Sequence, residues 1–418
     1  MNPLLNIKEY GQSIWLDYLS RPLLESGQLR RLIREDGLRG MTSNPAIFKK
    51  AITGGDAYDE TIRALARDGQ SVDQIYRNLV VTDIQDAADE FNSVYTSTGG
   101  RDGYVSLEVS PHLAHDTDGT VQEARELWAA VNRPNIFIKV PGTEAGIPAI
   151  WQLISEGINV NVTLLFGLSR YQTVAQAYID GLAECLQSGR PIENVRSVAS
   201  FFLSRIDVLV DQQLEAIIDQ NGPQAAVAAE LRGQVAIASA KHAYQMYKQI
   251  FGSDDFQQLR AQGANTQRLL WASTSTKDPA YSDVKYVEAL IGPNTVNTLP
   301  EETLDAYRDH GRPAPRLEEN LELSYKTLTR LYEVGIDLDE ATAQLEAEGV
   351  QKFIEPFDEL VEAITQQRRA ALDLAESPAV QSDDEAVEAH RAATVDPASK
   401  TDEAMWETFP ASDPPGNW

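Results

Sequence analysis

The sequence predicts an α/β protein with a (β/α)8 barrel. Short runs rich in β-branched, aromatic and leucine residues alternate along the chain with longer amphipathic stretches. Eight such runs can be counted, which is the number of strands that closes a barrel of this kind. Polar side chains also recur near the ends of these runs. In a (β/α)8 barrel the functional groups gather at the carboxyl ends of the strands, so this recurrence fits the same fold.

The strands are expected in the order of the eight runs. They cover residues 13–18, 40–44, 104–109, 136–141, 159–166, 197–204, 268–274 and 295–300. Helical patterns with apolar residues three and four apart lie between them, as from Ile75 to Phe91 and across residues 206–217. Ser169 is expected to begin one helix and Gly189 to follow its end. Cys185 lies on the apolar face of that helix, so a core position is expected.

Two regions are longer than a minimal (β/α)8 barrel requires. The interval 47–103 is too long for one crossover, so two or three helices are expected after the second strand. Helical patterns across 317–334 and 353–374 follow the last strand and should pack on the barrel.

The chain is expected to change character near residue 375. Residues 1–374 form the predicted barrel domain, and 375–418 form an acidic tail. The stretch from Glu376 onward holds ten acidic and two basic residues with scattered proline, which is typical of disorder. Met405, Trp406, Phe409 and Trp418 are unusual in such a tail. They could dock on a partner or on the barrel itself, or simply remain solvated.

Charge and composition limit the partners. The 418 residues include 36 basic and 63 acidic side chains, a formal net charge of -27. A field of this sign disfavours nucleic acid and anionic membranes, and a phosphorylated ligand would need local cations. The start of the chain has no charged leader before an apolar core, and no run of about eighteen apolar residues occurs, so a soluble, cytoplasmic protein is expected. With Cys185 as its single cysteine, the chain has no internal disulfide.

Lys139 ends an apolar run, where a buried strand would carry it. A buried ammonium is costly to desolvate unless it loses its proton, and a neutral amine is a nucleophile. Lys139 is therefore a candidate for Schiff-base chemistry. The alternative is a lysine at a strand end that reaches into solvent.

Other polar residues occupy comparable positions on the remaining strands. They are Asp17, Asn44, Glu108, Asn161, Thr163, Ser200 and the cluster Ser273 to Thr276. Strands of a parallel sheet are normally apolar on both faces. Any one of these residues could be a satisfied core hydrogen bond, but their recurrence favours a shared pocket.

Seven segments, in order, resemble the transaldolase family. They are GMTSNPAIF (40–48), VSLEV (105–109), IFIKVPGTEAG (136–146), INVNVTLLF (158–166), SFFLSRID (200–207), WASTSTKDPAYSD (271–283) and IGPNTVNTLPEETLDAYRDHG (291–311). The last two are similar to the long-chain bacterial branch. The resemblance covers roughly residues 1–372 and leaves the acidic tail outside.

The resemblance implies a role for each matching residue. Lys139 matches the Schiff-base lysine, Asp17 the acid/base of the first strand, and Glu108 with Thr163 the pair that handles the catalytic water. The substrate-binding positions are matched by Asn44, Asn161, Ser200 and Phe202, and the phosphate-binding positions by Arg205, Ser273 and Lys277. The match at Lys277 is looser, since shorter family members carry an arginine soon after Ala-Ser.

The implied reaction moves a dihydroxyacetone unit from a ketose phosphate to an aldose phosphate. The donors would be sedoheptulose 7-phosphate or fructose 6-phosphate, and the acceptors glyceraldehyde 3-phosphate or erythrose 4-phosphate, as in the non-oxidative pentose phosphate pathway. No cofactor or metal is expected, because the histidines form no convincing site with the carboxylates.

Two alternatives remain open. A simple aldolase would release the three-carbon ketone, but family members of that type tend to carry Tyr where this chain has Phe202. An idle barrel used as a scaffold is the other alternative. It has no physical reason to bury Asp17, Glu108 and Lys139 together.

Overall fold

The fold is a closed barrel of eight parallel strands. A computed structural model describes residues 2–376, and the predictions for the acidic tail, including Trp406, Phe409 and Trp418, lie outside these residues. The strands are β1 (Gln12–Leu16), β2 (Gly40–Met41), β3 (Tyr104–Glu108), β4 (Ile136–Pro141), β5 (Val160–Leu165), β6 (Ser197–Phe202), β7 (Arg268–Ala272) and β8 (Thr295–Leu299). Each strand pairs in parallel with its neighbours in sequence, and β1 closes the barrel on β8. The predicted (β/α)8 fold is confirmed.

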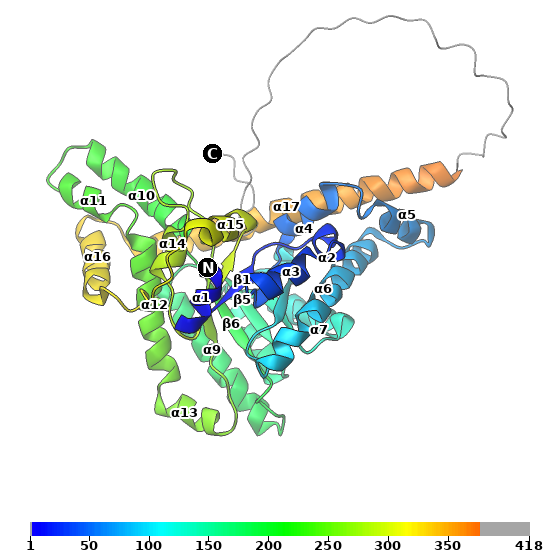
Figure 1. The fold of residues 1–418 in the computed structure, drawn as a ribbon, viewed down its shortest axis with the longest axis horizontal. Coiled ribbons are helices and arrows are strands. Elements are labelled where there is room, and N and C mark those ends of the chain that lie inside the picture. Colours follow the sequence, from blue (N-terminus) through cyan, green and yellow to red (C-terminus); the bar gives the residue numbers. More distant parts are fainter. Residues whose placement is uncertain (1, 377–418) are drawn as a thin grey trace, which may run out of the picture.

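Helices surround the strands (Figure 1). Before β3 they are α1 (Pro3–Ile7), the 3-10 helix η1 (Lys8–Tyr10), α2 (Arg21–Glu25), α3 (Gln28–Glu35), α4 (Pro45–Thr53), α5 (Asp59–Arg67) and α6 (Val72–Ser97). Between β3 and β7 they are the 3-10 helix η2 (Pro111–Leu113), α7 (Thr117–Val131), α8 (Gly146–Ser155), α9 (Leu168–Gln187), α10 (Ser204–Asp219), α11 (Ala225–Leu231), α12 (Val235–Phe251) and α13 (Asp254–Ala261). After β7 follow α14 (Lys285–Ala289), α15 (Glu301–His310), α16 (Leu321–Glu333) and α17 (Leu338–Glu376).

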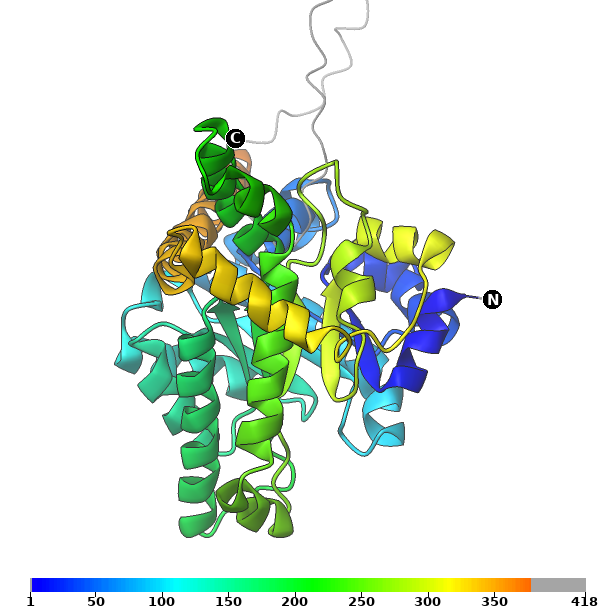
Figure 2. The ribbon, with the colours of Figure 1, turned by 90° about the vertical axis from the view of Figure 1, so that its left-hand side faces the viewer.

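The helices expected outside the minimal barrel are present. Three of them, α4, α5 and α6, fill the interval between β2 and β3, and a capping box of Ser71 and Gln74 begins the longest. In Figure 2, α16 crosses α12 on the outside of the barrel. The last helix, α17, lies against α4, α5 and α6, and Figure 1 shows it running along one end of the molecule. Cys185 is buried on α9, as expected.

Several predicted boundaries were wrong for local reasons. The second strand ends at Met41, three residues early, because Asn44 already caps α4 and turns the chain out of the sheet. Ser169 lies inside α9, whose first residue is Leu168 after Gly167. The final helix begins at Leu338 and continues to Glu376, so it is much longer than the predicted 353–374 and carries Pro356 in its interior. The proposed division of the chain at residue 374 stays a prediction.

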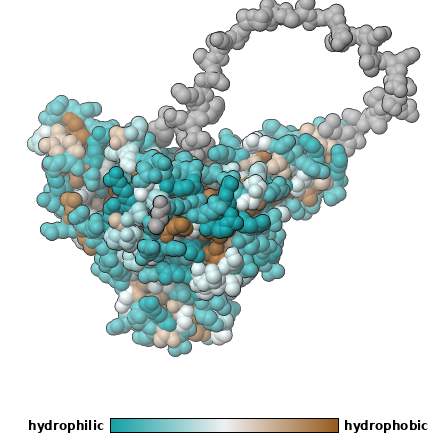
Figure 3. Space-filling view, in the orientation of Figure 1, coloured by the Kyte–Doolittle hydropathy of each residue, from teal (hydrophilic) through white to brown (hydrophobic). Residues whose placement is uncertain are grey.

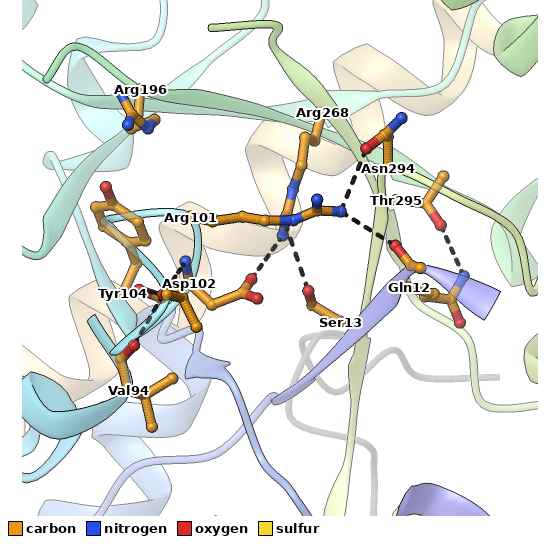
Figure 4. Close-up of polar contacts among 12 residues, drawn as sticks. Gln12, Ser13, Val94, Arg101, Asp102, Tyr104, Arg196, Arg268, Asn294 and Thr295 are labelled. Carbon is orange, nitrogen blue, oxygen red and sulfur yellow. Dashed lines mark hydrogen bonds and ion pairs between the residues drawn. The ribbon is translucent and has the colours of Figure 1, made fainter. Parts of the chain in front are cut away.

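A polar network closes the end of the barrel where the strands begin (Figure 4). Arg268 at the start of β7 donates to Asp102 Oδ1 at 3.0 Å and to Ser13 Oγ at 3.4 Å. Arg101 beside it donates to the Gly11 carbonyl and to Asn294 Oδ1. The donors drawn there are engaged by the protein itself, so this end serves as a structural floor.

The surface is mainly polar. The face drawn in Figure 3 is dominated by hydrophilic residues, with hydrophobic residues in small scattered groups. Among residues 2–376, no helix is both long and apolar enough to cross a membrane.

Candidate active site

The strand pairing brings side chains from three neighbouring strands to one height. Glu108 on β3 is level with Lys139 on β4, and Lys139 is level with Asn161 on β5. Thr163 lies two residues further along β5, opposite Pro141. Matched positions of adjacent strands point the same way, so these groups face the barrel interior near its carboxyl end.

The amine of Lys139 is buried between two acceptors. The residue is 4% exposed, and its Nζ donates to the Ser43 carbonyl and to Glu108 Oε2, both at 3.2 Å. The ring centroid of Phe353, on α17, lies 5.4 Å from the same Nζ. The structure therefore does not support the alternative interpretation of the sequence, in which Lys139 reaches into solvent.

Glu108 is buried beside this amine. Burial raises the pKa of its carboxyl group from 4.5 to about 7, and the neighbouring Lys139 limits the rise by favouring the charged form. The charge of Asp17 raises the pKa further. A carboxyl group with a pKa near 7 can both take and give a proton at neutral pH.

Asp17 follows β1 directly and is also buried. Its backbone N–H donates to the Leu299 carbonyl at 2.8 Å, and its Oδ1 accepts from Thr42 Oγ1 at 2.6 Å. Thr42 Oγ1 in turn lies 2.8 Å from Thr298 Oγ1 on β8. These contacts fix a carboxylate on the first strand that acts electrostatically on Glu108.

Thr163 sits at an irregularity in β5. The register with β6 shifts between Val162 and Leu165, and Leu164 adopts a left-handed backbone conformation with φ 58°. Such a bulge re-aims the side chains next to it and is common beside active sites. The Thr163 hydroxyl is buried and has no hydrogen-bond partner within residues 2–376, so it is available to bind a small polar molecule.

Asn161 and Ser200 belong to one hydrogen-bond chain. Asn161 Nδ2 donates to Ser106 Oγ at 3.0 Å, and Ser200 Oγ donates to Asn161 Oδ1 at 2.7 Å. Asn161 is level with Lys139 in the sheet, but its side-chain hydrogen bonds lead to β3 and β6.

Asn44 is placed by the turn after β2. Its side chain accepts from the Ile47 N–H at 2.9 Å and so caps α4, with Pro45 at the first helical position. Ser43 in the same turn donates from its hydroxyl to the Ser106 carbonyl and accepts from Lys139 through its own carbonyl. One short turn thus fixes both Asn44 and the amine of Lys139.

The sixth strand leads into the predicted phosphate-binding residues. Phe202 ends β6, and its ring lies 5.2 Å from that of Phe166. Arg205 is in the first turn of α10, mostly buried, with its guanidinium 5.9 Å from the Phe202 ring. Arg205 therefore lies on the helix that follows the sixth strand, and its assignment to a phosphate stays a prediction.

The seventh strand ends beside the sixth. Ser273 Oγ lies 2.8 Å from Ser204 Oγ, and Ser273 adopts φ 54°, a left-handed conformation that tightens the turn. Lys277, four residues further on, donates to Ser275 Oγ at 3.2 Å. Ser273 and Arg205 are thus tied together through Ser204, whereas Lys277 lies in the following loop.

Two carboxylates on α10 anchor that loop. Asp207 Oδ2 accepts from Lys285 Nζ and from the Tyr286 hydroxyl, both at 2.8 Å. Asp211 Oδ2 accepts from the Tyr281 hydroxyl at 2.7 Å. The helix that presents Arg205 therefore also holds the far end of the loop that carries Lys277.

Comparison with known proteins places these residues in a family. The family model for transaldolase/fructose-6-phosphate aldolase matches residues 14–364. The chain belongs to this family. The transaldolase of Trichodesmium erythraeum is 50% identical over 372 residues, which cover 87% of this chain and 97% of that protein. Transaldolase 2 of a Nostoc species is 49% identical, with 87% and 97% covered, and the transaldolase of Saccharopolyspora erythraea is 47% identical, with 86% and 96% covered.

The match to the transaldolase family includes every predicted site residue from Asp17 to Lys277 and continues into α17. Three residues that lie at the site were not predicted from the sequence. They are Ser43, Ser106 and Phe353. Both serines were visible in the matched segments, yet only strand register shows their contacts. Phe353 comes from a helix far along the chain, so no local pattern could have found it.

Within residues 2–376, no group of three or more His, Cys, Asp or Glu residues is arranged to hold a metal ion.

Proposed function

We propose that the protein is a transaldolase that carries a dihydroxyacetone unit on Lys139. The donor is sedoheptulose 7-phosphate or fructose 6-phosphate, and the acceptor is glyceraldehyde 3-phosphate or erythrose 4-phosphate. The observation that carries the proposal is the buried contact between Lys139 Nζ and Glu108, with Asp17 close enough to influence the same carboxyl group. An unreactive barrel gains nothing from this arrangement of buried charges.

The first step forms the Schiff base. Glu108 accepts a proton from Lys139, and the neutral amine attacks the C2 carbonyl of the ketose. The resulting carbinolamine loses water when Glu108 returns a proton to its hydroxyl group. We assign the water that carries these protons to the Thr163 hydroxyl; the absence of a hydrogen-bond partner for it in the described protein supports this assignment.

Cleavage and transfer then use Asp17. Its carboxylate takes the proton from the C4 hydroxyl, the bond between C3 and C4 breaks, and the electron pair passes into the iminium to give an enamine. The aldose phosphate leaves. When an acceptor aldehyde binds, the enamine carbon attacks it, and Asp17 returns the proton to the new hydroxyl group. Addition of water to the new iminium releases the product and restores Lys139.

The remaining residues bind the sugar. Asn44, Asn161 and Ser200 are assigned to the substrate hydroxyls, since Asn44 follows β2, Asn161 is level with Lys139 in the sheet, and Ser200 is hydrogen-bonded to Asn161. Arg205, Ser273 and Lys277 are assigned to the phosphate, because a protein of net charge -27 needs cations at close range to hold an anion.

Transfer is favoured over simple release of the ketone. Phe202 offers no hydroxyl to protonate the enamine, and its ring packs on Phe166 at the site. The three-carbon unit therefore stays on Lys139 until an acceptor arrives.

The test is a two-substrate assay. Fructose 6-phosphate with erythrose 4-phosphate should give sedoheptulose 7-phosphate and glyceraldehyde 3-phosphate at a rate far above the release of free dihydroxyacetone without acceptor. Equal rates of release and transfer would show an aldolase instead.

A further inference from the structure

The last helix reaches the amine that carries the chemistry. Phe353 lies on α17, is only 3% exposed, and places its ring centroid 5.4 Å from Lys139 Nζ. Glu108, Lys139 and Thr163 all belong to the strands, whereas Phe353 comes from a helix at least 190 residues further along the chain. An aromatic ring against a buried amine excludes water from one side of it and also attracts the ammonium form.

The helix is fixed on both sides of Phe353. Before it, Glu346 accepts from Arg170 Nε of α9 at 3.0 Å. After it, Glu359 forms an ion pair with Lys49 of α4. These partners belong to the helices that follow β5 and β2, so α17 spans the ends of the strands that lie between them, β3 and β4.

The helix also sits directly on the fifth strand. A Cβ atom at Gly349 would lie 3.1 Å from Leu164 Cδ2 and 3.4 Å from the Phe166 ring. Leu164 is the left-handed residue of the β5 bulge, next to Thr163. The close approach at Gly349 brings α17 down onto this bulge, and Phe353 follows one turn later on the same helix.

We propose that Phe353 is a positioning residue that covers Lys139 and keeps bulk water away from the bound three-carbon unit. The inference rests on the proposed function, and it adds a residue that decides between transfer and release. Phe353 confines the waters near Lys139 to the position offered by Glu108 and Thr163.

The chemistry of release explains why shielding matters. To leave as free ketone, the enamine must gain a proton at its nucleophilic carbon, which gives an iminium. Water must then add to the iminium carbon, and the amine must leave. The sum is enamine plus one water giving dihydroxyacetone plus the free lysine. Transfer also ends in addition of water to an iminium, but only after the acceptor aldehyde has taken the place of the proton. Excluding water molecules that could protonate the enamine carbon therefore slows release of the ketone more than it slows transfer.

The test compares substitutions at two buried positions of α17. Phe353→Ala opens the cover, Phe353→Leu keeps an apolar side chain without the ring, and Val350→Ala, one turn earlier, is the matched control for loss of packing. For each variant, the rate of dihydroxyacetone release from fructose 6-phosphate without acceptor is divided by the rate of transfer to erythrose 4-phosphate. We expect this ratio to rise about tenfold in Phe353→Ala, to rise less in Phe353→Leu, and to stay at the wild-type value in Val350→Ala.

Two outcomes would overturn the inference. The first is an unchanged ratio in Phe353→Ala, or in Phe353→Leu if the alanine variant does not fold. The second is an equal rise in Val350→Ala, which would mean that loosening the helix is sufficient. Borohydride trapping with fructose 6-phosphate separates these failures from failure of the proposed function. A wild-type adduct on Lys139 with an unchanged ratio refutes only the role of Phe353, whereas the absence of any adduct refutes both.

Discussion

Lys139 and Glu108 form a buried, hydrogen-bonded ion pair. Their separation of 3.2 Å is a hydrogen-bond distance, and both side chains are about 5% exposed. With its pKa raised to about 7 by burial, Glu108 is ionised in only part of the molecules at neutral pH. The carboxylate form is the one that can take a proton from the amine.

This gives a prediction for the pH dependence of the reaction. Because the free enzyme needs ionised Glu108, kcat/KM for fructose 6-phosphate should rise with pH through a value near 7 and level off above it. Glu108→Gln should lower kcat by about a hundredfold or more and remove this rise. A pH profile measured on both proteins checks it. An unchanged rise in the variant would assign the titration to another group.

Arg205 gives a prediction about binding. Arg205→Ala should raise KM for phosphorylated acceptors by roughly tenfold or more while changing kcat little, since a charge-assisted hydrogen bond to an anion is worth about 1.5 to 3 kcal/mol. The comparison is with glyceraldehyde, which carries no phosphate and should lose little. If KM for glyceraldehyde 3-phosphate is unchanged, the phosphate does not lie at Arg205.

At the scale of elements, the sequence predicts the strands well because parallel strands buried on both faces have an apolar signature. It places Lys139, Glu108 and Asp17 near strand ends. In the structure Glu108 ends β3, Asp17 directly follows β1, and Lys139 lies two residues before the end of β4. The bulge at Leu164 has no comparable signal, since leucine rarely adopts a positive φ. The contact of Phe353 with Lys139 depends on tertiary packing of α17, which periodicity does not encode.

The anchoring of the loop after β7 gives a prediction for α10. Asp207→Ala leaves Lys285, Tyr286 and the Ala236 N–H without their shared buried acceptor. The expected loss of stability is about 3 to 5 kcal/mol, as for other broken buried pairs. Chemical denaturation measures it, with the exposed Asp219→Ala at the end of the same helix as control. A loss no larger than that of the control would contradict an anchoring role.

At the scale of the whole molecule, the two ends of the barrel have separate tasks. The floor around Arg268 and Asp102 is internally paired (Figure 4). The opposite end of the barrel carries the candidate catalytic groups. Arg268→Ala should therefore destabilise the fold by about 3 to 5 kcal/mol, because it leaves buried Asp102 unpaired. Its kcat per folded molecule should remain close to the wild-type value. A large fall in kcat at full folding would show that the ends are coupled.

The strongly negative charge of the chain makes the location of its cations informative. A net charge of -27 disfavours a sugar phosphate at long range, so the proposed phosphate site needs cations at close range, which we assign to Arg205 and Lys277. Raised ionic strength would screen both the long-range repulsion and this proposed local attraction.

The claim that Lys139 is the Schiff-base nucleophile is tested most directly by trapping. Borohydride added during turnover of fructose 6-phosphate should reduce the iminium to a stable amine, and peptide mass spectrometry should find a reduced adduct derived from the ketose on Lys139. Lys139→Ala should give no adduct and no transfer. An adduct on another lysine, or full activity in Lys139→Ala, would contradict the mechanism proposed for this site.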